Sequence, residues 1–98
     1  MDEVVKAKRQ AAQAEQLHRE MQLKESMVWA LSDPRGRRLL WAVMEQCGLW
    51  QVLSGPAGAD LLNYREGQRT IGSWILSKIA ETDPAAFIVM QQEHADAA

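Results

Sequence analysis

Arginines are the residues of this 98-residue chain whose type and spacing best suit binding chemistry. Five of the seven form two groups within predicted helices: Arg35, Arg37 and Arg38, then Arg65 and Arg69. Cations in the first turn of a helix are unfavourable by about 0.3–1 kcal/mol each, and a like-charged i,i+4 pair is unfavourable too. Local chemistry therefore does not explain these placements, and we predict that the arginines contact an acidic surface on a partner protein.

The arginines could also serve two further roles. Arg38 or Arg69 would form an internal bridge if it reached Glu45 or Glu66 across a helix interface. Alternatively, all five arginines would bind DNA phosphates if they converged in space. The net charge of −2 gives the chain no general attraction for nucleic acid, so DNA contact is not favoured.

Enzymatic and metal chemistry have little support in the sequence. His18, Cys47 and His94 are widely spaced, and neither paired metal ligands nor a phosphate-binding glycine loop is present. We therefore expect no catalytic activity and no cofactor. Cys47 is the only cysteine, which excludes an intramolecular disulfide and is typical of a reducing compartment.

The four tryptophans are too many for the core of so short a chain. We predict that Trp41 and Trp74 are buried. Trp29 and Trp50 should be partly exposed, and partly exposed tryptophans are typical anchors of protein interfaces.

Residues 2–32 contain neither Pro nor Gly and are rich in good helix formers, so a long helix is predicted. A thin apolar seam with heptad spacing follows its first half, with His18 in the same register: Val4, Ala7, Ala11, Ala14 and Met21. A helix with so narrow a stripe is marginal alone in water. It should therefore lie against the same helix of another subunit or in a groove of a larger partner, the alternative being a solvated arm.

Asp33-Pro34 and Asp83-Pro84 each predict a helix start, because Asp is a good N-cap and Pro suits the first helical position. The first of these helices should run over 34–47 and end at Gly48. The loop SGPAG (54–58) should precede a helix that is capped by Asp60 or Asn63 and ends near Glu81. A last helix should run from Pro84 to about His94. The predicted buried faces are Leu39, Leu40, Val43, Met44 and Cys47 on one helix, and Tyr64, Ile71, Trp74, Ile75 and Ile79 on the next.

The predicted fold is all-α: an N-terminal arm helix (1–32) followed by a compact three-helix unit (33–98). The N-terminus resembles no signal peptide, and no stretch approaches the roughly 18 apolar residues that a membrane helix needs. We therefore expect a soluble protein with no membrane partner.

Three stretches carry a resemblance to a known family: DPRGRRLLWAVMEQCGLW (33–50), NYREGQRTIGSWILSKI (63–79) and residues 84–93. They resemble short proteins of tailed bacteriophages that are encoded near the portal and capsid genes. The resemblance implies a structural protein of the virion, assembled in the host cytoplasm, that binds the portal or lies inside the head and is ejected with DNA. It carries over no catalytic residue. A small DNA-binding regulator and a homo-oligomeric coiled-coil scaffold remain alternatives.

Overall fold

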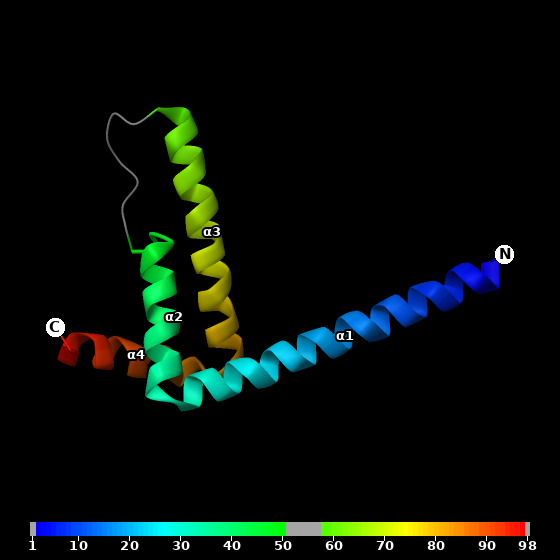
Figure 1. Ribbon diagram of the computed structural model, residues 1–98, viewed down its shortest axis with the longest axis horizontal. Helices are drawn as coiled ribbons and strands as arrows, with labels where there is room; N and C mark the ends of the chain where they lie inside the picture. The colour runs from blue at the N-terminus through cyan, green and yellow to red at the C-terminus, as the bar shows by residue number, and fades with distance from the viewer. Residues whose placement is uncertain (1, 51–57, 98) are drawn as a thin grey trace.

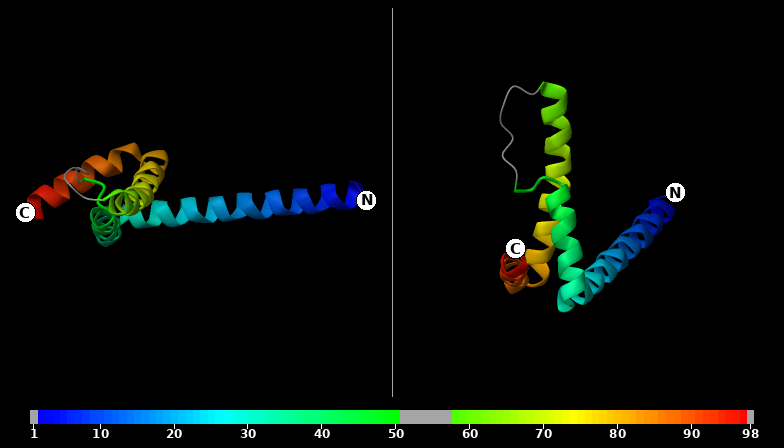
Figure 2. Two further views of the ribbon diagram at one scale, coloured as in Figure 1. Left: turned by 90° about the horizontal axis from the view of Figure 1, so that it is seen from above. Right: turned by 60° about the vertical axis from the view of Figure 1, so that its left-hand side comes forward.

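The computed structural model describes residues 2–50 and 58–97 of the chain, and these form four helices without a strand. The helices are α1 (Asp2–Ser32), α2 (Pro34–Gln46), α3 (Ala59–Thr82) and α4 (Pro84–Ala97). Helices α2 and α3 run side by side in opposite directions and form an upright stem (Figure 1). Helix α1 leaves the base of this stem to one side and the shorter α4 to the other, so the molecule is flat and has the outline of an inverted T with unequal arms, with extents of 59 × 39 × 17 Å (Figures 1 and 2). The predicted all-α fold with a long N-terminal helix is confirmed.

Local capping chemistry sets most of the helix ends. Asp33 takes an extended conformation and its side chain accepts a hydrogen bond from the Arg35 backbone N–H, so α2 begins at Pro34 as predicted. Asp83 does the same for Ala85 at the start of α4. Gly48 has a φ of 71°, the left-handed conformation that commonly terminates a helix.

The predicted N-cap of α3 is wrong, although the helix begins beside Asp60. The helix begins at Ala59, after an extended Gly58 that makes no side-chain cap, and it runs through both Asp60 and Asn63. Asp60 lies in the first turn, where a carboxylate is favoured by the helix dipole without being the cap. Helix α4 continues to Ala97, past the predicted end at His94. Most of the predicted 54–58 loop lies outside the described residues.

The core is small and lies at the base of the stem, where all four helices meet. Its buried residues are Met27, Leu31, Met44, Ile75, Ile79, Ala86 and Met90. Met44, Ile79 and Met90 are almost fully enclosed, and each comes from a different helix. The last turns of α1 thus belong to this core. The expected division into 1–32 and 33–98 follows the helix boundary, whereas packing begins at Met27.

The predicted buried face of α3 is largely wrong, and that of α2 is wrong in part, since Leu40 packs against the core as predicted. On α3, Tyr64, Ile71 and Trp74 have exposed fractions of 66%, 57% and 48%, and only Ile75 and Ile79 are buried. On α2, Leu39 and Val43 are exposed as well, while Met44 is enclosed. The reason is geometric: α1 and α4 pack only at the base of the stem, so Tyr64 and Ile71, higher on α3, have no helix above them (Figure 1). Leu39 lies low on α2 but does not belong to the core.

Gly36 allows α1 and α2 to meet at the base. A Cβ atom at this position would lie 2.8 Å from both the Cα and the carbonyl carbon of Ala30, and closer still to the Ala30 carbonyl oxygen. Only a residue without a side chain lets the first turn of α2 lie directly on the backbone of α1.

Among the described residues, no helix combines the length and apolar character that crossing a membrane requires.

Candidate protein-docking site

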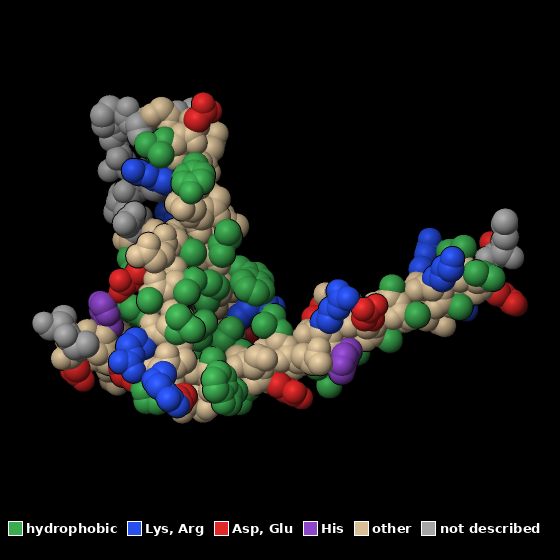
Figure 3. Space-filling model, in the orientation of Figure 1, with side chains coloured by type: hydrophobic (Ala, Val, Ile, Leu, Met, Phe, Trp, Pro, Cys, Tyr) green, Lys and Arg blue, Asp and Glu red, His purple; other side chains and the backbone are tan. Residues whose placement is uncertain are grey.

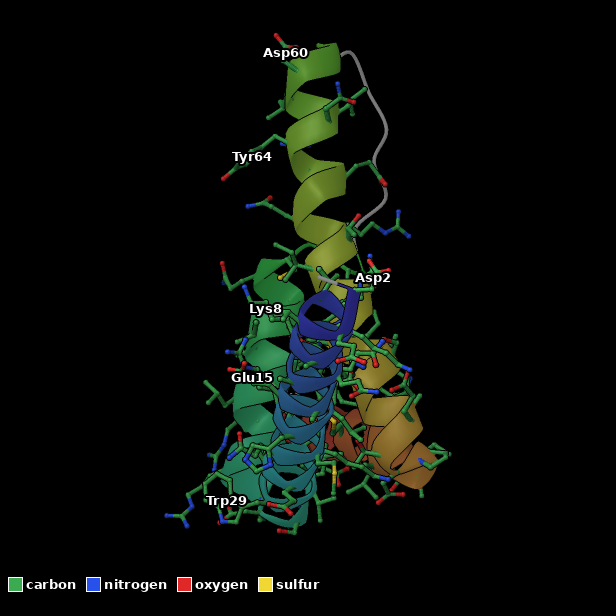
Figure 4. All side chains as sticks on the ribbon, turned by 90° about the vertical axis from the view of Figure 1, so that its right-hand side faces the viewer. Asp2, Lys8, Glu15, Trp29, Asp60 and Tyr64 are labelled. Atoms are coloured by element: carbon green, nitrogen blue, oxygen red, sulfur yellow. The ribbon has the colours of Figure 1, made fainter. Side chains whose placement is uncertain are left out.

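Exposed basic and apolar side chains gather where α1 bends into α2. We call this set the bend surface: Trp29, Arg35, Arg38 and Leu39. Trp29 has 70% of its surface exposed and Leu39 66%, although both are large apolar residues. Figure 3 shows basic and hydrophobic side chains side by side around this bend, and Figure 4 shows Trp29 projecting away from the helices. Trp and Arg are the residue types most enriched in the energetic centres of protein interfaces.

Arg35 is tied to the helix cap beside it. Its guanidinium donates to both carboxylate oxygens of Asp33, with Nη2–Oδ2 at 2.8 Å and Nε–Oδ1 at 3.2 Å. These side-chain bonds lower the pKa of Asp33 below its ordinary value, and the hydrogen bond from the Arg35 backbone N–H lowers it further by a smaller amount. The Arg35 side chain is still 82% exposed. It therefore remains accessible to a partner while part of its charge is offset.

Arg37 is turned inward and joins three helices. Its Nε and Nη2 donate to the two carboxylate oxygens of Glu93 on α4, at 2.7 and 3.0 Å, while Nη1 donates to the Leu31 carbonyl oxygen of α1 at 2.8 Å. Only 16% of the Arg37 side chain is exposed. Because all these bonds lie within the chain, we no longer expect Arg37 to contact a partner.

The Arg37–Glu93 pair predicts how stability depends on pH. The hydrogen bonds from Arg37 lower the pKa of Glu93 below its ordinary 4.5, so the pair stabilises the fold fully above that pH. Its contribution is lost as the pH falls through the lowered pKa of the folded state. The melting temperature, followed by circular dichroism from pH 7 to pH 2, should be steady near neutrality and fall below about pH 4.5.

Two substitutions test the source of this acid sensitivity. Glu93→Gln should lower the melting temperature at neutral pH. It should also reduce the fall in melting temperature below about pH 4.5, which we call the acid limb. Glu25→Gln is the control, because Glu25 is exposed and has no ion pair within residues 2–50 and 58–97. An acid limb in Glu93→Gln as steep as that of wild type would contradict the assignment.

Arg38 stands on the rim of a pocket between α2 and α4. The pocket has a volume of about 210 Å³ and is lined by Pro34, Arg37, Arg38, Trp41, Met90, Glu93 and His94. Arg38 makes no ion pair with any described residue. The combination of an apolar floor and a cationic rim suits an acidic peptide segment that also carries an apolar side chain.

An aromatic stack forms the wall beside this pocket. Trp41 lies 5.1 Å from Trp50, 6.1 Å from Phe87 and 4.8 Å from His94, measured between ring centroids. The Trp41 indole N–H donates to Glu45, so its polar atom has a partner. Trp50 is 44% exposed, and both tryptophans predicted to be partly exposed are confirmed as such. Trp41 is half-buried against the core, whereas the prediction that Trp74 is buried is wrong.

The arginines of α3 do not join those of α2. Arg65 and Arg69 belong to the upper part of the stem, whereas Arg35 and Arg38 lie at its base, because α2 and α3 run in opposite directions (Figure 1). The five arginines thus form no single phosphate-binding surface. Arg69 pairs with Glu66 at 3.8 Å, but within α3, so the predicted bridge across a helix interface is not found there.

The arginine that does bridge two helices, Arg37, pairs with Glu93, a carboxylate that the sequence pattern did not single out. Glu93 lies near the end of the last helix, and nothing in its immediate sequence marks it as the partner of an arginine on another helix. Its role depends on α4 crossing the base of the stem beside α2.

The N-terminal arm carries the other predicted docking residues. Every side chain from Asp2 to Ser26 is exposed, including the whole predicted seam of Val4, Ala7, Ala11, Ala14 and Met21. We call residues 2–26 the projecting segment. Residues 27–32, in contrast, approach the core. No group of residues suited to holding a metal ion is found within the described ranges.

The fold and these surfaces define a small all-helical protein with exposed basic and apolar side chains. Residues 27–92, more than half of the chain, match the family described as Bbp19-like phage protein, and the chain belongs to this family. The match begins at Met27, the residue at which the core begins. No curated protein and no solved structure matches the chain.

Proposed function

We propose that this phage protein is a non-catalytic structural component of the virion that docks onto a larger virion protein, with the portal as the partner. The observation that carries the proposal is the bend surface. All four of its residues lie within the stretch that matches the family, and its two large apolar side chains are exposed.

The chemistry of the bend surface favours a protein partner. Arg38 has no ion pair among the described residues, and a partner carboxylate would supply a charge-assisted hydrogen bond. Trp29, in the same surface, offers an exposed aromatic ring, and removing water from that ring favours binding. An apolar anchor next to a free cation is the composition expected at the centre of a protein interface.

A virion partner also suits the size of the surface. A single contact of a few residues is weak, but a portal or an internal core presents many identical copies of one surface. If several copies of this protein bound to each other and to that repeated surface, each contact made would raise the effective concentration for the next one. The net charge of −2 and the separation of the arginines speak against DNA as the main partner.

Charge reversal at Arg38 tests the proposed docking. We expect Arg38→Glu, supplied during infection by a phage that lacks the gene, to reduce incorporation into purified particles at least tenfold, measured by quantitative mass spectrometry. Trp29→Ala should reduce it as well. Neither side chain belongs to the core, so both variants should keep the wild-type circular dichroism spectrum.

Lys6→Glu is the matched control, because it makes the same change of charge at an exposed position far from the bend. It should be incorporated normally. Absence of the wild-type protein from purified virions would overturn the virion assignment. Normal incorporation of Arg38→Glu and Trp29→Ala would instead rule out the bend surface as the docking site.

A further inference from the structure

Helix α3 exposes an apolar seam that none of the described residues covers. Leu61, Tyr64 and Ile71 are 44%, 66% and 57% exposed, and with Gln68 they follow a three-four-three heptad spacing. Beside this seam a shallow groove of about 410 Å³ separates α3 from α2, and it is lined by Ala42, Val43, Gln46, Cys47, Gln68 and Ile71. Such a seam is typical of a helix that packs against another helix.

The projecting segment exposes a second seam with the same spacing. Val4, Ala7, Ala11 and Ala14 repeat the three-four-three pattern, and all four are exposed. Their side chains are small, whereas those of the α3 seam are large. Small residues let a helix approach closely, so large side chains of one helix fit between small ones of the other.

The two seams cannot meet within one chain. Helix α1 is continuous from Asp2 to Ser32 and carries the projecting segment away from the stem (Figures 1 and 2). Folding it back would require a break in a helix that contains neither Pro nor Gly. The two seams also match in length, because Val4 to Ala14 spans the same number of residues as Leu61 to Ile71.

We propose that the projecting segment of one copy packs on the α3 seam and the adjoining α2–α3 groove of a second copy. The surfaces used include neither Trp29 nor Arg38, so this pairing goes beyond the proposed docking function and can be tested without a virion. It differs from a coiled coil of two arms, because each arm pairs with the stem of the other copy.

The charges that flank the seams favour a parallel arrangement with Val4 opposite Leu61. In that register Glu3 lies opposite Arg65 and Lys8 opposite Asp60, at the positions that form ion pairs between packed helices. An antiparallel arrangement would instead bring Lys8 toward Arg65, which is unfavourable. The pairing also supplies a partner for Arg65, which has none among the described residues.

Cys47 provides a direct test, because it lines the groove and is the only cysteine of the chain. In the purified full-length protein, Ala14→Cys should form an intermolecular disulfide with Cys47 of a second copy under mild oxidation. Peptide mass spectrometry should identify the link between positions 14 and 47. The disulfide should disappear when Cys47→Ala is added. Ala12→Cys, on the opposite side of the same helix, should cross-link far less.

The competing outcomes each overturn the proposal. A 14–14 disulfide that persists in the Cys47→Ala background would show that the arms pair with each other. A monomeric protein by light scattering across micromolar to hundred-micromolar concentrations, without any cross-link, would show that no pairing occurs.

A second measurement does not depend on cysteine chemistry. Ile71→Arg should lower the mass measured by light scattering to that of a monomer, and it should keep the wild-type helicity because Ile71 is exposed. Arg65→Glu should weaken association at least fivefold, and adding Glu3→Lys should restore it. An oligomer unaffected by Ile71→Arg would overturn the proposed surface, and a failure of the charge exchange to restore association would overturn the parallel register.

Discussion

Replacing Gly36 with alanine is expected to destabilise the fold by about 1–3 kcal/mol or more. The added methyl group would lie 2.8 Å from two backbone atoms of Ala30, and backbone cannot move aside as a flexible side chain can. Helices α1 and α2 would have to separate at the base, where Leu31 and Met44 belong to one core. Thermal and urea denaturation followed by circular dichroism would measure the loss.

Gly67→Ala is the matched control for this substitution. Gly67 also lies within a helix, but a Cβ atom there would meet nothing within 4 Å. Alanine should therefore stabilise α3 by about 0.5–1 kcal/mol, the ordinary gain over glycine in a helix interior. If Gly36→Ala behaved like Gly67→Ala, the close approach of α1 and α2 would be disproved.

Ile79→Ala is expected to have the largest effect of any single truncation in the core. Ile79 is fully buried between the helices, and removing a buried isoleucine side chain to alanine costs about 2–5 kcal/mol. A chain of this size has a total stability of only about 5–10 kcal/mol, so the variant should lose much of its cooperative unfolding transition near room temperature. Urea titration at 25 °C would show this as a large fall in the midpoint concentration.

Trp74→Ala is the informative comparison. The apolar spacing of α3 predicted Trp74 in the core, which would make its truncation severe. In the structure it is 48% exposed and its ring carries the Lys78 ammonium 5.9 Å from its centroid. Removal of so exposed a ring should cost about 1 kcal/mol or less. A loss from Trp74→Ala as large as that from Ile79→Ala would contradict the observed packing.

Different parts of the molecule serve the proposed docking and the proposed self-association. The bend surface lies within the family stretch of residues 27–92, whereas the seam of the projecting segment lies before it. A second copy that covers the projecting segment would leave the bend surface free for a virion protein. Self-association and docking would then act together, because each raises the effective concentration for the other.

Three helix ends could be predicted because the signals for them are local. Asp33-Pro34 and Asp83-Pro84 supply an N-cap and a preset first helical residue, and Gly48 supplies the left-handed residue after α2. The long α1 follows from a segment without Pro or Gly. The exposure of Trp29 and Trp50 was also predictable, since so small a core has no room for four indoles.

Only the tertiary structure decided which helix faces are buried and which arginine forms an ion pair within the chain. Apolar spacing predicted a continuous buried face from Tyr64 to Ile79, but α1 and α4 cross the stem only at its base, so burial stops near Ile75. Likewise, the sequence pattern grouped Arg37 with Arg35 and Arg38 and did not show that it faces another helix of the same chain. The crossing of α4 places Glu93 beside Arg37, because the position of one helix across another depends on close contacts such as that at Gly36 and not on the periodicity of either helix.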